Sequence, residues 1–268
     1  MNQNDSAISL SQVKKDYGAF SALKGIDLEI NRGELFGFLG PNGAGKTTLI
    51  RIMVGIIKPS SGTVKIRGND ILTESQKAKS CTGYIPDRPY LYEKLTPLEY
   101  FDFVSGLYSV PPDKCKKNGE EMLKMFSLWD WRNELIESFS HGMKQKVAMT
   151  ASLMHDPDVI IVDEPMVGLD PKSVRIVKDF FKDLVKRGKT IFLTTHTLSV
   201  AEDLCDRIGI INRGQVAIMG TLDYLKDTLK SGDPTLENLF LKITEEEEEI
   251  QTAPMIPDNH PKDTGEFG

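Results

Sequence analysis

A glycine-rich loop at residues 40–48, of sequence GPNGAGKTT, holds the residue types with the clearest chemical meaning in this chain. Glycine adopts backbone conformations that other residues avoid, so successive N–H groups of such a loop can point inward around phosphate oxygens. Lys46 is then placed to reach the β- and γ-phosphates of a nucleotide, and the hydroxyl of Thr47 is a ligand for Mg²⁺. We therefore expect a nucleoside triphosphate to bind here with Mg²⁺, through Gly40, Pro41, Asn42, Gly43, Ala44, Gly45, Lys46, Thr47 and Thr48.

The sequence on either side of the loop favours this interpretation over a chance glycine-rich turn. Residues 35–39 (LFGFL) are typical of a strand, and residues 49–54 (LIRIMV) are typical of a helix. The order strand, glycine loop, helix is the context that a phosphate-binding loop requires. The positive end of the helix would face the same anion.

Two carboxylates follow a second apolar run, at residues 159–162 (VIIV). We expect Asp163 to hold Mg²⁺ opposite Thr47, either directly or through water. Glu164 comes one residue later and therefore faces another direction, from which it can polarise a water for in-line attack on the γ-phosphate. Taken alone, the same pattern would also fit a strand that happens to end in acidic residues.

His196 follows a third apolar run, at residues 191–195 (IFLTT). A histidine at the end of a strand can touch the γ-phosphate and so sense whether it is present. A lone histidine is more often structural, so this role depends on the other residues of the predicted site.

The elements that must position these residues alternate between strands and helices. Strands are predicted at residues 8–13, 26–30, 35–39, 63–66, 159–162 and 190–195, and a hairpin at 208–219. Helices are predicted at residues 97–108, 113–126, 172–186 and 198–204, within or after a helical stretch at 88–155. This alternation predicts an α/β fold with a mainly parallel sheet flanked by helices, an N-terminal antiparallel part and an inserted helical subdomain. Ligands of such sheets lie beyond the carboxyl ends of the strands, where the glycine loop lies.

Length and composition limit the classes of function. A chain of 268 residues has room for one α/β domain with a smaller insertion, and its formal charge of −6 argues against broad nucleic-acid binding. It contains no run of 18 apolar residues and no signal-like N-terminus, and its cysteines (81, 115 and 205) have no metal-binding spacing. Residues 245–268 begin with five glutamates and continue with prolines and polar residues, which predicts a disordered acidic tail.

Taken together, the motifs over about residues 6–240 resemble the ATP-binding subunits of ABC transporters. Residues 40–48 are similar to the Walker A loop of that family, residues 159–164 to Walker B with the catalytic glutamate, and residues 138–146 (SFSHGMKQK) to the signature. Residues 168–171 (GLDP) are similar to the D-loop, His196 to the switch histidine, and Tyr17 to the aromatic residue that stacks on adenine. The resemblance implies an ATPase of the P-loop NTPase class, in which two subunits hold two ATP molecules head to tail. Each ATP would lie between Walker A of one subunit and Ser140, His141 and Gly142 of the other.

Two positions depart from the common pattern of the family. The signature usually reads LSGGQ, whereas residues 139–143 read FSHGM, so Ser140 and Gly142 are kept and His141 and Met143 are not. His141 either adds a cation beside the phosphate or only fills space. Asp87 stands where many members carry a glutamine that approaches Mg²⁺; it either reaches the metal through water or only shapes the loop.

The resemblance also implies partners. We expect a polytopic membrane subunit of an export-type transporter and a second ATP-binding subunit, identical or different, which would place the chain in the cytoplasm on the inner face of the cell membrane. The aromatic residues near 88–94 and at Tyr100 and Phe103 either receive a helix of the membrane subunit or pack the helical subdomain. The alternative function is a soluble ABC ATPase that assembles or remodels a cytosolic complex.

Overall fold

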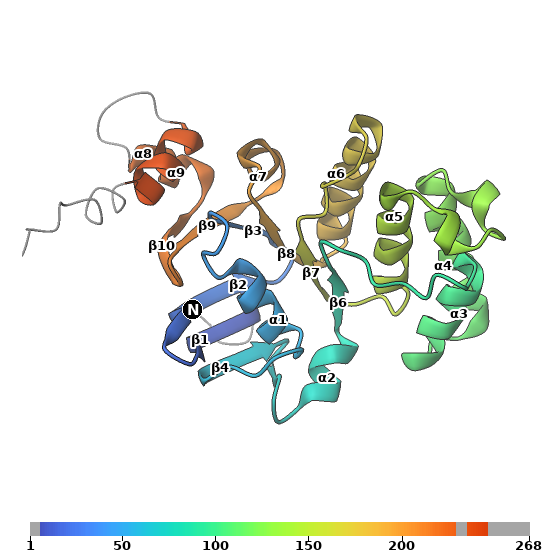
Figure 1. Ribbon diagram of the computed structural model, residues 1–268, viewed down its shortest axis with the longest axis horizontal. Helices are drawn as coiled ribbons and strands as arrows, with labels where there is room; N and C mark the ends of the chain where they lie inside the picture. Colours follow the sequence, from blue (N-terminus) through green and yellow to red (C-terminus); the bar gives the residue numbers. More distant parts are fainter. Residues whose placement is uncertain (1–5, 229–234, 246–268) are drawn as a thin grey trace, which may run out of the picture.

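The computed structural model describes residues 6–228 and 235–245, and the fold below refers to these (Figure 1). Their N-terminal part is a four-stranded antiparallel sheet in the order β2-β1-β4-β5. Its strands are β1 (Ser6–Tyr17), β2 (Phe20–Asn31), β4 (Ser61–Ile66) and β5 (Asn69–Asp70). The first two strands are longer than predicted, because shifts in the β1–β2 register, one of them between Leu10 and Val13, let the pairing continue to Tyr17.

A six-stranded sheet in the order β10-β9-β3-β8-β7-β6 forms the centre of the described residues. Its strands are β3 (Leu35–Leu39), β6 (Thr82–Ile85), β7 (Val159–Asp163), β8 (Thr190–Thr195), β9 (Arg207–Asn212) and β10 (Gln215–Gly220). Every neighbouring pair is parallel except β9–β10, so the prediction of a mainly parallel sheet is confirmed. All residues of β3, β7 and β8 are buried, which explains why these strands read as unbroken apolar runs.

Helices cover this sheet and extend from it on one side, where α3, α4 and α5 stand together (Figure 1). The helices are α1 (Lys46–Met53), α2 (Ser75–Ser80), α3 (Pro97–Leu107), α4 (Pro112–Met125), α5 (His141–Ser152), α6 (Pro171–Lys186), α7 (Leu198–Leu204), α8 (Leu222–Asp227) and α9 (Leu236–Glu245), with short 3-10 turns at Trp129–Trp131 and Ile136–Ser138. The predicted inserted helical subdomain is therefore present, although its bounds at about 88 and 155 remain a prediction.

Local capping explains where two of these helices begin. Thr96 and Glu99 form a capping box at the start of α3, with Pro97 in the first turn. Asp170 caps α6 by accepting a hydrogen bond of 3.0 Å from the backbone N–H of Ser173. Both helices therefore start at residues whose side chains satisfy N–H groups that have no partner within the helix.

The core lies on both faces of the parallel sheet. Phe192 of β8 stacks on Phe36, and its ring centroid lies 5.4 Å from that of Phe38. A second apolar cluster lies between the sheet and helices α3 to α6, and a third joins β9 to α7, α8 and α9. The predicted tail begins at Glu245, which ends α9; the rest of it, 246–268, lies outside the described residues. Among the helices described, none is long and apolar enough to cross a membrane.

Candidate active site

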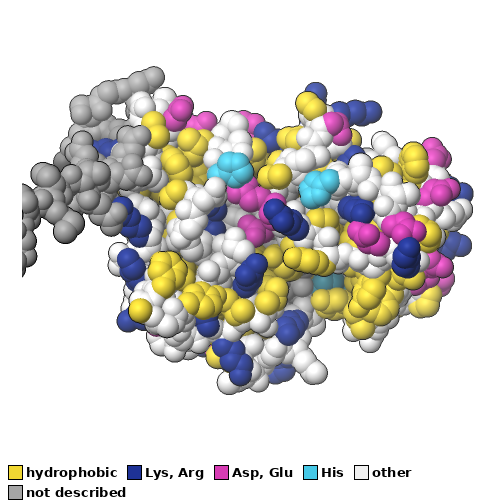
Figure 2. All heavy atoms as spheres, in the orientation of Figure 1, with side chains coloured by type: hydrophobic (Ala, Val, Ile, Leu, Met, Phe, Trp, Pro, Cys, Tyr) yellow, Lys and Arg dark blue, Asp and Glu magenta, His cyan; other side chains and the backbone are white. Residues whose placement is uncertain are grey.

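A cavity of about 540 Å³ opens at the carboxyl ends of the parallel strands. Figure 2 shows acidic and histidine side chains gathered near the middle of this face, above the central sheet. The cavity is lined by residues of the glycine loop, by residues at the end of β1 and the start of β2, and by residues at or after the ends of β6, β7 and β8: Tyr17, Phe20, Ala22, Pro41, Asn42, Gly43, Gly45, Lys46, Thr47, Thr48, Asp87, Asp163, Glu164, Val167 and His196. Segments far apart in the sequence thus meet here because parallel strands end at one edge of a sheet.

The glycine loop turns tightly into helix α1. Gly45 has a φ of 111°, and a Cβ atom there would lie 2.8 Å from the carbonyl oxygen of Ala22, so only glycine fits. Gly40 and Ala44 belong to the predicted binding set but do not line the cavity: Gly40 lies against Ile211, and Ala44 is buried beneath the loop. These two residues support the loop from behind.

Lys46 is held inside the curve of the loop. Its ammonium group donates hydrogen bonds to the carbonyl oxygens of Gly40, at 2.5 Å, and Pro41, at 3.1 Å. Burial lowers the pKa of Lys46, and the nearby carboxylates of Glu164 and Asp163 oppose this effect. The side chain is therefore a desolvated cation that an incoming phosphate would satisfy better than two neutral carbonyl groups do.

Asp163 lies at the end of β7 and is 4% exposed. The hydroxyl of Thr194 donates a hydrogen bond of 2.6 Å to its Oδ1 atom. Burial raises the pKa of Asp163; the bond from Thr194 opposes the rise, the carboxylate of Asp87 adds to it, and Lys46 and a bond from Thr47 lower it. Sequence reasoning missed Thr194, although its place one strand away and level with Asp163 follows from the parallel pairing of β7 and β8.

The residues at this position fit Mg²⁺. Thr47 and Asp163 offer a hydroxyl and a carboxylate, which are hard oxygen ligands, and both line the cavity. Within the described residues, no cluster of three or more His, Cys, Asp or Glu side chains could hold a metal on its own. In proteins Mg²⁺ is usually bound through one or two carboxylates and completes its shell with substrate phosphates and water.

Glu164 and His196 form a pair at the mouth of the cavity. Nδ1 of His196 lies 2.8 Å from Oε1 of Glu164, and the two side chains are 58% and 15% exposed. Glu164 has a φ of 48°, a conformation that non-glycine residues rarely adopt, and its N–H donates to the carbonyl oxygen of Thr194 at 3.1 Å. Backbone strain of this kind often accompanies functional positions, because the surrounding fold must hold the residue in place. The contact between these side chains was not foreseen from the sequence.

Two aromatic side chains, Tyr17 and Phe20, also line the cavity. Tyr17 and Phe20 face each other across the turn that joins β1 to β2, and they are 50% and 63% exposed. The ammonium group of Lys15 lies 5.1 Å from the centre of the Tyr17 ring. Tyr17 was predicted, whereas Phe20 was missed; the Gly18-Ala19 turn between the two residues is the signal that could have revealed it.

The signature residues lie away from this cavity, at the start of α5. Ser140 caps the helix by accepting a hydrogen bond of 3.3 Å from the N–H of Met143. The ring of His141 lies against Gly168, so a Cβ atom on Gly168 would come within 2.5 Å of it. Gly142 also lies close to the carbonyl oxygen of Gly168. Within one chain, therefore, His141 and Gly142 lie against the D-loop region, and none of Ser140, His141 and Gly142 lines the predicted nucleotide site.

Comparisons with known proteins agree with this geometry. A family model described as ABC transporter matches residues 23–167. The linearmycin resistance ATP-binding protein LnrL of Bacillus subtilis is 39% identical over 238 residues, which cover 89% of this chain and 76% of LnrL. A solved structure of the ATP-binding subunit of an ABC transporter matches with a TM-score of 0.84 and 29% identity, over 89% of this chain and 99% of that one.

A second solved structure is a dimeric ATP-binding cassette in a post-hydrolysis state, bound to ADP and Pi. It matches with a TM-score of 0.73 and 27% identity, over 80% of this chain and 98% of its own. The chain belongs to the ABC transporter family, as an ATP-binding subunit.

Proposed function

We propose that this subunit binds ATP with Mg²⁺ and hydrolyses it to drive export through separate membrane subunits. The observation that carries the proposal is the placement of the Glu164–His196 pair in the same cavity as Lys46, Thr47 and Asp163. One part of the cavity then offers a cation and hard oxygen ligands for phosphate and metal, while the other offers a carboxylate for water.

Each side chain has a distinct part in hydrolysis. Lys46 leaves the carbonyl groups that hold it and binds the β- and γ-phosphates. Thr47 and Asp163 would hold Mg²⁺, which would supply positive charge beside the phosphates. Glu164 accepts the proton of the attacking water, and His196 fixes the orientation of that carboxylate. Tyr17 and Phe20 stack on the base of the nucleotide.

The complete site requires a second ATP-binding subunit. Ser140, His141 and Gly142 lie at the start of a twelve-residue helix, yet they do not line the cavity of their own chain. A hydroxyl and free N–H groups at a helix start are suited to a phosphate, so these residues are proposed to meet the γ-phosphate held by the other subunit. The dimeric form of the related ATP-binding cassette supports this arrangement.

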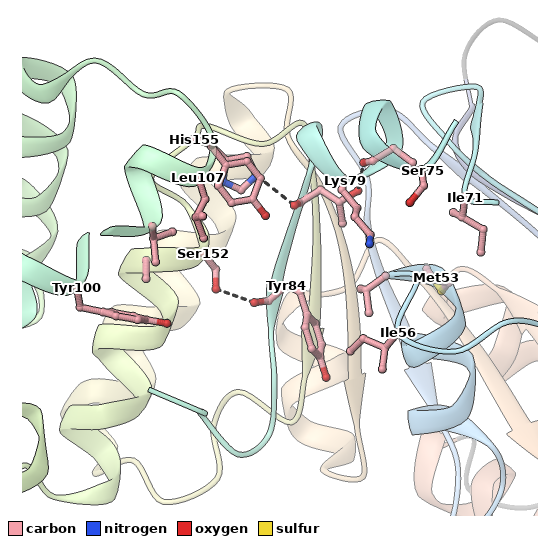
Figure 3. A pocket seen from close by; sticks show the side chains of 17 residues that line it. Met53, Ile56, Ile71, Ser75, Lys79, Tyr84, Tyr100, Leu107, Ser152 and His155 are labelled. Carbon is pink, nitrogen blue, oxygen red and sulfur yellow. Dashed lines mark hydrogen bonds between the residues drawn. The ribbon is translucent and has the colours of Figure 1, made fainter. Parts of the chain in front are cut away.

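The membrane subunit is proposed to dock in a second cavity, of about 320 Å³, between α1, α2 and β6 on one side and α3 and α5 on the other (Figure 3). Its rim exposes apolar side chains, with Ile56 61% and Leu107 68% exposed. Among the described residues that line it, none is acidic, and Lys79 supplies a positive charge. These features suit a short helix with an apolar face and an acidic residue. The subunit would then lie in the cytoplasm, on the inner face of the cell membrane.

This groove differs from the docking region predicted from the sequence. Tyr100 lines the groove, but its ring also packs against the ring of Tyr92, with the two centroids 6.2 Å apart. The ring of Tyr92 packs in turn against that of Phe103, with centroids 5.1 Å apart. Figure 2 shows hydrophobic side chains gathered over the segment between β6 and α3. We therefore assign the cluster of residues 92, 100 and 103 to packing within the helical subdomain and place the partner in the groove beside it.

The export direction rests on a relative. LnrL is named for resistance to linearmycin, and resistance is a function that removal of a compound from the cell can provide. The transported compound would be selected by a membrane subunit.

Hydrolysis is tested with Glu164→Gln and Lys46→Ala. Glu164→Gln should keep ATP affinity, lose about 10²- to 10⁴-fold in turnover and accumulate an ATP-bound dimer, because only the general base is removed. Lys46→Ala should lose ATP affinity in calorimetry. Turnover in Glu164→Gln equal to that of the parent would refute the assignment of Glu164.

Transport is tested by copurification from gently solubilised native membranes. A stoichiometric polytopic membrane protein is expected with the parent and with Leu241→Glu, a matched control whose exposed leucine lies on α9. Leu107→Glu should lose that partner but keep basal ATPase activity. Recovery of soluble proteins alone would replace the transporter with a cytosolic assembly ATPase, with the same nucleotide chemistry.

A further inference from the structure

Gln145 is a buried polar residue outside the lining of the nucleotide cavity, and only one half of its side-chain amide is hydrogen-bonded among the described residues. It lies on α5, is 1% exposed, and donates a hydrogen bond of 3.0 Å from Nε2 to the carbonyl oxygen of Pro86. Its Oε1 atom is also buried and accepts no hydrogen bond from the described residues. A buried amide with one half unpaired is destabilising, so its presence requires a reason beyond filling space.

The two ends of this hydrogen bond lead to two functional regions. Gln145 lies on the second turn of the helix that begins with His141 and is capped by Ser140. Pro86 immediately precedes Asp87, which lines the nucleotide cavity and contributes to the raised pKa of Asp163. A single buried side chain thus connects the signature helix to the loop beside the nucleotide.

Other contacts join α5 to the same segment but are suited to different roles. Lys144 and Glu93 form an ion pair of 2.6 Å at the surface, where such pairs contribute little. Ser152 donates a hydrogen bond of 2.6 Å to the carbonyl oxygen of Tyr84, at the far end of α5 from the signature (Figure 3). Gln145 is therefore the buried contact nearest to the signature residues.

We propose that Gln145 is a positioning residue, which sets the orientation of the start of α5 according to the position of the Asp87 loop. When a nucleotide and its metal shift that loop, the bond to Pro86 carries the shift to Ser140 and Gly142 and orients them for the second subunit. The inference rests on the proposed function, in which those two residues bind the nucleotide of the partner.

The test uses the full chain carrying Glu164→Gln, in which dimers accumulate. Gln145→Met removes both polar groups at similar size, and Gln145→Glu keeps acceptors but loses the N–H donor when ionised. The matched control is Thr150→Val: Thr150 is fully buried on the same helix, but its hydroxyl bonds only to the carbonyl oxygen of Lys146 in that helix.

Both Gln145 variants should bind ATP as the parent does, whereas their ATP-dependent dimerisation should weaken about tenfold, which corresponds to about 1.4 kcal/mol. Hydrogen exchange should show ATP-induced protection near residue 87 in all variants, and protection at residues 140–143 only where Gln145 is intact. Thr150→Val should match the parent in both measurements. The exchange measurement is made at a protein concentration low enough to keep every variant monomeric, so that it tests Gln145 without the protection that a dimer interface would give.

Three results would overturn the inference: parental dimerisation in both Gln145 variants, ATP affinity that falls together with dimerisation, or the same defect in Thr150→Val. A parent that neither binds ATP nor dimerises would instead refute the proposed function. The two failures are therefore distinguishable.

Discussion

Replacing Thr194 with valine removes one hydroxyl next to the predicted metal ligand and changes little else. Thr194 is fully buried, and its bond of 2.6 Å to Asp163 is made to an ionisable group. Hydrogen bonds to charged groups contribute about 1.5–3 kcal/mol, so the loss of this bond should raise the free energy of ionising Asp163 by about that amount. At acid pH, where the protonated form dominates, the carboxylate form should be about 10- to 100-fold less populated.

Because Mg²⁺ binds the carboxylate form, the Thr194→Val protein should show MgATP affinity that falls at a higher pH than in the parent. Calorimetry from acid to alkaline pH measures this, and titrations without Mg²⁺ separate the metal from the nucleotide. Affinity without Mg²⁺ should be unchanged, and the MgATP affinities should converge at alkaline pH.

Thr190→Val is the matched control. Thr190 lies at the other end of β8, is 1% exposed, and accepts a hydrogen bond of 3.0 Å from the N–H of Gly33. Thr190→Val should lower the free energy of unfolding by an amount similar to Thr194→Val, without changing the pH dependence of MgATP affinity. Identical pH profiles for Thr194→Val and the parent, or the same shift in Thr190→Val, would refute the argument that Thr194 keeps Asp163 ionised.

Three further predictions concern stability and nucleotide affinity. Burial raises the pKa of Asp163, so between the usual Asp pKa and the raised value the native state binds more protons than the unfolded chain, and the free energy of unfolding falls as the pH rises through this window. Asp163→Asn should therefore raise the melting temperature of the nucleotide-free protein near neutral pH. That gain should disappear below the usual Asp pKa, where Asp163 is protonated in both states. Phe20→Ala and Tyr17→Ala should each weaken ATP binding by about 1–3 kcal/mol in calorimetry, and equal affinity in either variant would remove that ring from the site. Phe192→Ala should lower the free energy of unfolding by about 3–5 kcal/mol in denaturant titrations; a loss below 1 kcal/mol would mean that the core refills the space.

The parts of the fold that could be predicted are those encoded by neighbouring residues. The apolar runs at β3, β7 and β8 are buried on both faces, and this burial leaves a readable pattern whatever the strands pair with. Asp170-Pro171 marks the start of α6 because a capping side chain and a fixed φ act locally. The glycine loop belongs to the same class, since its conformation depends on its own glycines.

Residues that act through long-range packing could not be predicted in this way. Phe20 reaches the cavity only because the β1–β2 pairing and its register shifts place it opposite Tyr17. The Glu164–His196 contact depends on two loops 32 residues apart. Helices α8 and α9 escaped prediction because they are stabilised by burial against α7 and the β9–β10 hairpin, and the local sequence does not show these tertiary contacts.

Residues 84–87, at the end of β6 and just after it, explain why the proposed docking groove and the nucleotide cavity should be coupled. Tyr84 lines the groove, Pro86 accepts the bond from Gln145, and Asp87 lines the nucleotide cavity. The three steps from residue 84 to residue 87 span at most about 10 Å of extended chain, and the segment is stiff because Ile85 is fully buried and Pro86 has a fixed φ. A helix that moves Tyr84 must therefore displace Pro86 or Asp87 as well. Thermodynamic linkage makes this coupling reciprocal. If a partner bound in the groove changes the affinity for ATP by some factor, then bound ATP must change the affinity for that partner by the same factor.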